Sequence, residues 1–294
     1  MCSTLLSNKN LMKKLFIPLV LATVSVSSFA DEKVVSATND IGSLPQELVG
    51  PSAAFNNKEG WRYAAGIGLE YEALYHGSDE TEMELTPYVE IAFSKDNWEF
   101  QTNIFNNRFI YQGSETLFYT GWINLEDGRD EESSEEGILD GMGEIDDQIE
   151  IGGGISWQPV DKLTISLVGQ GYAGGDTDKG YVGFLSAHYR IIEQANFVFE
   201  VGADISFGNS QHLTSEFGVS KQQSIDSGYS EYAIDGGLKS YGLSANGTYL
   251  IRENMSVAFG VHYEVYTSDI SDSPLIKVGA DSEIEAELTF IYQF

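Results

Sequence analysis

Acidic side chains recur at every second position in several segments of this 294-residue sequence, a spacing that could concentrate charge on one surface. If these segments are strands, alternate residues share a face. The acidic candidates for one inward-facing surface are then Glu70, Glu72, Glu82, Glu84, Glu90, Glu150, Glu200, Asp204, Glu264, Glu283, Glu285 and Glu287. The basic residues on the same faces are Arg62, Arg190 and Lys239. An open space lined in this way favours cations, whereas a filled one requires the acids to be paired, hydrated or protonated.

The histidines are the remaining candidates for acid–base chemistry: His76, His188, His212 and His262. A Ser–His hydrolase built on a membrane barrel needs a histidine beside a serine on the lipid-facing side. His188 and His262 instead share the polar face of their segments. A protease could use aspartates of the long connections, but no spacing singles out Asp226, Asp235, Asp269 or Asp272. We therefore predict no catalytic residue and no cofactor.

A separate group of acids crowds residues 126–147: Glu126, Asp127, Asp130, Glu131, Glu132, Glu135 and Glu136. Carboxylate-rich loops can bind Ca²⁺ or the divalent ions that bridge lipopolysaccharide. The spacing does not match a calcium-binding loop, however, and runs of like charge are usually solvated. We therefore predict no metal site here.

The elements that carry these residues show a period of two. Apolar and polar residues alternate over 61–75, 82–93, 148–157, 197–207, 255–265 and 283–294, and more weakly over 97–111, 115–125, 162–173, 179–190 and 236–251. Segments of about 10 to 15 residues suit a tilted membrane span better than a soluble sheet. Aromatic residues gather near the segment ends, as in interfacial girdles: Tyr63, Tyr71, Tyr75, Trp98, Trp157 and Tyr292. The pattern predicts an all-β, transmembrane, antiparallel up-and-down β-barrel. A soluble periplasmic β-sandwich is the alternative.

Eleven alternating segments predict twelve strands, because bacterial barrels of one chain have an even number. Connections at 159–161, 193–195 and 252–254 resemble short periplasmic turns. The long segments 126–146, 208–235 and 269–281 then lie on the outside, and the twelfth strand lies before residue 126. A short strand at 211–219 would instead place the acidic segment in the periplasm.

The N-terminal part predicts export. Lys13 and Lys14 precede an apolar run from Leu15 to Val26, and small residues favour cleavage after Ala30. We expect a signal peptide over 1–30, an extended periplasmic segment over 31–60 and the barrel over 61–294. Cys2, the single cysteine, is removed with the signal peptide. The mature chain keeps 13 basic against 45 acidic residues, a formal charge of −32, which excludes nucleic acid as a partner.

The final strand carries a predicted assembly signal. Its apolar face ends in Phe290, Tyr292 and Phe294. A terminal aromatic on such a strand is the address that the barrel-assembly machinery reads, so we expect this machinery and outer-membrane lipids as partners.

Several motifs resemble one family. Phe217-Gly218-Val219-Ser220, Gly236-Gly237-Leu238-Lys239-Ser240, Asp272-Ser273-Pro274 and the earlier Tyr75-His76-Gly77-Ser78 are similar to segments of the MipA/OmpV outer-membrane proteins. The acidic insertion over 126–147 departs from that pattern. The resemblance implies a non-enzymatic barrel in the outer membrane of a Gram-negative cell. It also implies a scaffold for murein hydrolases and synthases, with a lytic transglycosylase and a penicillin-binding protein as partners. The alternative is a narrow cation-preferring channel, or a porin-like solute pore or adhesin.

Overall fold

The computed structural model describes residues 59–103, 106–134, 136–174 and 179–294. The predicted signal peptide over 1–30, and residues 31–58 of the predicted periplasmic segment, lie outside the described residues. Among the residues that are described, no helix is long and apolar enough to cross a membrane.

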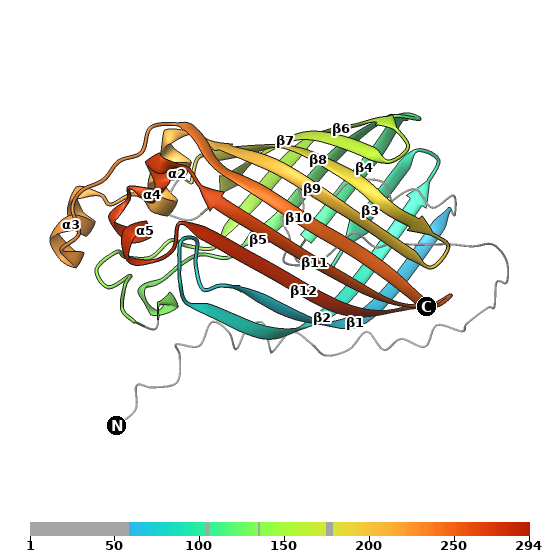
Figure 1. Ribbon diagram of the computed structural model, residues 1–294, viewed down its shortest axis with the longest axis horizontal. Helices are drawn as coiled ribbons and strands as arrows, with labels where there is room; N and C mark the ends of the chain where they lie inside the picture. Colours follow the sequence, from blue (N-terminus) through green and yellow to red (C-terminus); the bar gives the residue numbers. More distant parts are fainter. Residues whose placement is uncertain (1–58, 104–105, 135, 175–178) are drawn as a thin grey trace, which may run out of the picture. The chain divides into compact units, whose positions relative to one another are not determined.

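Twelve strands form one closed antiparallel barrel in the described part of the chain (Figure 1). They are β1 (Gly60–Ala73), β2 (Thr81–Lys95), β3 (Trp98–Thr102), β4 (Asn106–Ser114), β5 (Leu117–Glu126), β6 (Gln148–Val160), β7 (Leu163–Ala173), β8 (Tyr181–Gln194), β9 (Phe197–Gly208), β10 (Gly237–Arg252), β11 (Met255–Tyr266) and β12 (Ser282–Gln293). Each strand pairs with its neighbour in the chain, and β1 closes the barrel against β12. The predicted fold class is confirmed.

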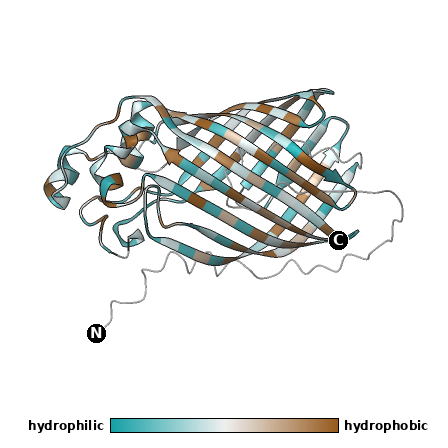
Figure 2. Ribbon diagram, in the orientation of Figure 1, coloured by the Kyte–Doolittle hydropathy of each residue, from teal (hydrophilic) through white to brown (hydrophobic). Residues whose placement is uncertain are grey.

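The period of two places apolar side chains outside and polar ones inside. Ile67, Leu167 and Leu243 on the outer face are exposed, whereas Ser166, Ser186 and Thr289 on the inner face are buried. Bands of both characters alternate along the strands in Figure 2. Outer aromatic rings pack in pairs, including Trp61–Phe93, Trp98–Tyr111 and Phe197–Phe259.

The twelfth strand comes from the weak 97–111 segment, which is two strands rather than one. β3 ends at Thr102, and β4 begins at Asn106. The Asn103 side chain accepts a hydrogen bond from the Asn106 amide at 2.8 Å, which stabilises the reversal. The extra strand therefore lies before residue 126, as predicted.

The strand order places all the long connections at one end, here called the loop end, and five two-residue turns at the other, the turn end. The turns are residues 96–97, 115–116, 161–162, 195–196 and 253–254. The short β3–β4 connection lies on the loop-end side of the barrel. The acidic segment over 127–147 shares the loop end with 74–80, 209–236 and 267–281. The competing strand at 211–219 is wrong, because α2 (Ser210–Phe217) occupies that segment.

Short capped helices build the loop end. The Asn209 side chain caps α2 by accepting from the His212 amide at 2.9 Å. Ser220 and Gln223 form a capping box at α3 (Lys221–Ser227). The other helices in the described part of the chain are α4 (Ser268–Ser271), α5 (Pro274–Val278) and a 3₁₀ turn, η3 (Glu131–Ser133). Figure 1 shows the α-helices grouped at this end of the barrel.

Candidate functional site at the loop end

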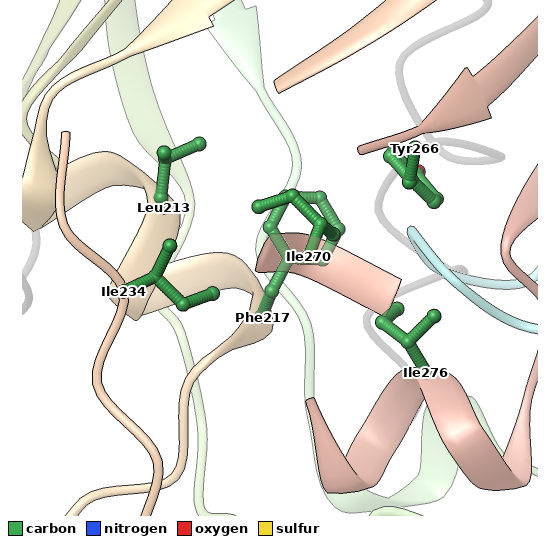
Figure 3. Close-up of a cluster of buried hydrophobic side chains, with 6 residues drawn as sticks. All are labelled: Leu213, Phe217, Ile234, Tyr266, Ile270 and Ile276. Atoms are coloured by element: carbon green, nitrogen blue, oxygen red, sulfur yellow. The ribbon is translucent and has the colours of Figure 1, made fainter. Parts of the chain in front are cut away.

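An apolar cluster holds the loops together at the barrel mouth. Its members are Leu213, Phe217, Ile234, Tyr266, Ile270 and Ile276 (Figure 3). Phe217 is fully buried, and its ring meets Tyr266 edge-on with the centroids 5.1 Å apart. The cluster therefore joins α2, α4 and α5 to the end of β11.

A second apolar cluster extends this packing to the remaining loops. It contains Tyr75, Leu139, Met142, Val219 and Leu275. Tyr75 is therefore not a girdle residue: it lies two positions beyond β1 and is buried among the loops, so its predicted place at a membrane interface is wrong. The two clusters bring together loops that are far apart in sequence.

The motifs noted in the sequence converge here. The Ser273 hydroxyl donates to the Phe217 carbonyl at 2.5 Å and also accepts from the Leu275 amide. Gly77 has φ of +84° and donates its amide to Glu283. A side chain at Gly77 would meet the Cδ1 of Ile276 at 2.0 Å. The left-handed backbone therefore favours glycine here, and any larger residue would also have to displace the end of the Ile276 side chain.

A layer of charged groups lies next to the apolar clusters. Glu283 accepts from the Tyr266 hydroxyl and lies 3.2 Å from His76 Nδ1. Lys239 Nζ lies 3.4 Å from Glu264 and 5.9 Å from the centre of the Phe217 ring. These contacts link three strands to the loops above them, and they pair two of the predicted inner acids with cationic groups.

Glu216 of α2 anchors a second part of the layer. Its carboxylate lies 3.6 Å from Lys179 Nζ, and its carbonyl accepts from Arg129 at 3.0 Å. Burial alone would raise the pKa of Glu216, but Lys179 and the neighbouring cations outweigh burial and lower it to about 2. Burial lowers the pKa of His212 to about 4. These loop residues show no sequence periodicity, which is why the alternation did not reveal them.

The contact between His76 and Glu283 predicts a pH-dependent stability. Burial alone would lower the pKa of His76, but the Glu283 carboxylate outweighs it and raises the pKa to about 9. The stabilisation is therefore fully present below about pH 6.5 and is lost as the pH rises through about 9. The heat-induced unfolding midpoint of wild type should exceed that of His76→Gln at pH 6, and the difference should vanish near pH 10. A difference that is constant with pH would contradict the contact.

Seven of the twelve predicted inner acids are buried: Glu90, Glu150, Glu200, Asp204, Glu264, Glu283 and Glu287. Hydrogen bonds satisfy several of them. Glu150, for example, accepts from Trp122 Nε1 at 2.6 Å, Asn124 Nδ2 at 2.9 Å and Gln170 Nε2 at 2.7 Å. Along these residues the inner wall is covered by protein atoms, and several of the acids have polar partners.

The other five candidates are more open. Glu70, Glu72 and Glu285 are half-buried, and Glu82 and Glu84 are exposed on β2. The alternation overlooked Glu99, which is fully buried in the short strand β3 and lies 2.9 Å from Arg62. Arg190 pairs with Glu193 at 3.2 Å.

Among the described residues, the groups considered for catalysis lie partly inside the barrel and partly in its loops. His262 lies 3.2 Å from Asp204, and both face the barrel interior, as does the buried His188. The loop aspartates Asp226, Asp235, Asp269 and Asp272 are exposed. No group of three or more His, Cys, Asp or Glu within the described ranges could hold a metal ion.

The acidic segment is tied to the loop end by its own contacts. Two contacts lie within the segment: Arg129 pairs with Ile145 as an isolated bridge, and Glu131 accepts from the Gly143 amide at 2.9 Å. A third reaches the β1–β2 connection, where Ser134 donates to Glu80 at 2.9 Å. Because barrels keep long loops outside the cell, we expect this end to be extracellular.

An epitope tag tests that orientation. The tag is inserted after Gly143, because a Cβ added at this glycine would have no atom within 4 Å. It should bind antibody on intact cells. The same tag between Glu253 and Asn254, in a turn, should bind only after permeabilisation. The reverse pattern would place the acidic segment in the periplasm.

The three residues of the predicted assembly signal lie at the turn end. Tyr292 and Phe294 are exposed, with ring centroids 5.1 Å apart, and Phe290 is half-buried. The Phe294 amide donates to the Tyr63 carbonyl at 2.9 Å. Their role in assembly stays a prediction.

Comparisons with known proteins place the fold in context. A family model described as MltA-interacting protein MipA matches residues 65–294. A search of curated proteins found no match. Among solved structures, the CymD monoaromatic hydrocarbon channel is 11% identical, with 90% of this chain and 94% of that chain covered and a TM-score of 0.44. A Pseudomonas aeruginosa FadL homologue is 10% identical, with 86% and 95% covered and a TM-score of 0.42. The translocator domain of the Neisseria meningitidis autotransporter NalP is 9% identical, with 82% and 91% covered and a TM-score of 0.41.

Proposed function

Because the chain belongs to the MltA-interacting protein MipA family, we propose that this outer-membrane β-barrel is a non-enzymatic scaffold that holds a lytic transglycosylase close to the peptidoglycan. The observation that carries the proposal is the extent of the family match, which includes nearly all of the barrel and every loop-end motif. A penicillin-binding protein is a further partner on the same proposal.

Two features of the barrel favour a binding role. The loops pack on one another through two apolar clusters at one end. Seven inner acids are buried, and several of them have polar partners, as expected for a filled interior rather than a wide aqueous channel. On this proposal, the enzyme docks at the turn end, which would face the periplasm.

Co-isolation from cross-linked envelopes tests the scaffold. We expect the tagged barrel to recover a lytic transglycosylase. Charge reversal at exposed turn-end acids, Asp161→Lys with Glu253→Lys, should lower the recovery. The matched loop-end pair, Asp226→Lys with Asp235→Lys, should leave it unchanged. Equal recovery with both pairs would argue against docking at the turn end, and no recovery with wild type would argue against the scaffold.

A narrow cation-preferring channel is the second candidate, and the excess of acids on the inner face favours it. Reconstitution in planar bilayers separates the two. The scaffold predicts no stepwise current. Discrete current steps that carry K⁺ in preference to Cl⁻ would support the channel.

A further inference from the structure

The wall of the barrel has a gap above its shortest strand. β2 pairs with β1 over Thr81–Ser94, but with β3 only over Ile91–Lys95, because β3 has five residues. Among the described residues, no strand pairs with the β3-facing edge of Thr81–Pro87.

The backbone direction shows which groups this edge presents. The Leu74 amide donates to the Glu80 carbonyl, so these two residues form a hydrogen-bonded pair of the β1–β2 ladder. Such pairs alternate in antiparallel sheets. Every second residue from Thr81 to Pro87 therefore points its backbone groups away from β1. Proline at position 87 fits this direction, because it has no amide hydrogen to give to the ladder.

Three amide donors and four carbonyl acceptors are therefore aligned along an open edge. They belong to Thr81, Met83, Leu85 and Pro87, of which proline supplies only the carbonyl. An open edge is a template for pairing with another strand. Within the hydrocarbon layer such an edge must be covered, because each unsatisfied backbone group costs several kcal/mol there.

The side chains specify the strand that would fit. Outward-facing Met83 and Leu85 are 65% and 66% exposed. Glu82 and Glu84 alternate with them and face the opposite side of the strand: Glu82 lies directly across from Glu72, and Glu84 directly across from Glu70. Like charges opposite each other are destabilising, whereas an added strand with cations at these positions would relieve the repulsion.

We propose that the edge Thr81–Pro87 is a docking site for an extended polypeptide with alternating basic and apolar residues. The added strand would take the place that longer β3 and β4 strands would fill. Its backbone would complete the ladder, its basic side chains would face Glu82 and Glu84, and its apolar side chains would lie beside Met83 and Leu85. This site is distinct from the turn-end docking of the scaffold.

A synthetic probe tests the site on the full chain in detergent micelles. We expect a fluorescent heptapeptide, Lys-Val-Lys-Val-Lys-Val-Lys, to bind with saturation, and the same peptide with glutamate in place of lysine not to bind. Glu82→Gln with Glu84→Gln should weaken binding about two- to thirtyfold, because two opposite-charge pairs worth about 0.2–1 kcal/mol each are lost. The control, Glu115→Gln with Glu231→Gln, changes exposed acids outside Thr81–Pro87 and should bind as wild type does.

Hydrogen exchange separates strand pairing from simple charge attraction. Bound peptide should slow exchange of the Met83 and Leu85 amides at least about tenfold, because hydrogen-bonded amides exchange only on opening. Binding without this protection, or equal binding by both double variants, would overturn the proposal. A third result would also overturn it: slow exchange of these amides in the absence of peptide that becomes fast when residues 31–58 are deleted. The edge would then be covered by the chain's own N-terminal segment. None of these outcomes depends on whether a lytic transglycosylase is recovered.

Discussion

Phe217→Ala should open the loop end while leaving the barrel folded. Phe217 is fully buried at the centre of the first apolar cluster, and truncation of such a ring costs about 3–5 kcal/mol. Since 1.4 kcal/mol is a factor of ten, we expect the open fraction of the loops to rise about a hundredfold or more. This fraction is measured by the rate of limited proteolysis within residues 209–236. The cleavage is followed on protein that still migrates on gels as a folded barrel.

The matched control is Ile225→Ala on α3. Ile225 is 68% exposed and belongs to neither apolar cluster, so its cleavage rate should stay close to that of wild type. Equal cleavage of the Phe217 and Ile225 variants would mean that the cluster does not hold the loops closed.

Arg62→Met should destabilise the barrel itself. Arg62 lies 2.9 Å from Glu99, whose side chain is fully buried, and donates to Ser94 at 2.7 Å. Removing one partner of a buried pair leaves an uncompensated charge and costs about 3–5 kcal/mol. We expect a lower urea midpoint for unfolding from lipid vesicles, and a lower temperature for the shift to unfolded mobility on gels.

The double variant Arg62→Met with Glu99→Leu separates the lost pair from lost packing. It removes both charges, and replacing a buried pair with apolar groups is often nearly neutral. We therefore expect it to recover most of the stability. A double variant as unstable as Arg62→Met would show that the Arg62 stem, rather than its charge, stabilises the wall.

Alternation predicted most strands because a half-buried strand repeats every two residues. It failed at 97–111, where two strands were taken for one. Trp98 and Phe100 face outward at even positions, whereas Phe109 faces outward at an odd one. The outward-facing aromatic residues therefore switch from even to odd positions between β3 and β4. This switch is visible in the sequence and could have revealed the reversal.

The loop-end site could be predicted only in part. The Ser220–Gln223 capping box is a local signal for α3, and it could have been used. The contacts of Phe217 with Tyr266 and of Glu283 with His76 join residues tens to hundreds of positions apart. No local period encodes such contacts, because loop packing depends on how the strands bring the loops together. The resemblance marked the right segments but not their partners.

Binding of a purified lytic transglycosylase to the purified barrel in lipid nanodiscs tests the scaffold most directly. We expect saturable binding that Asp161→Lys with Glu253→Lys weakens and that Asp226→Lys with Asp235→Lys does not. Absence of binding by folded wild-type barrel, together with cation-selective current steps from the same preparation, would contradict the scaffold and favour the channel.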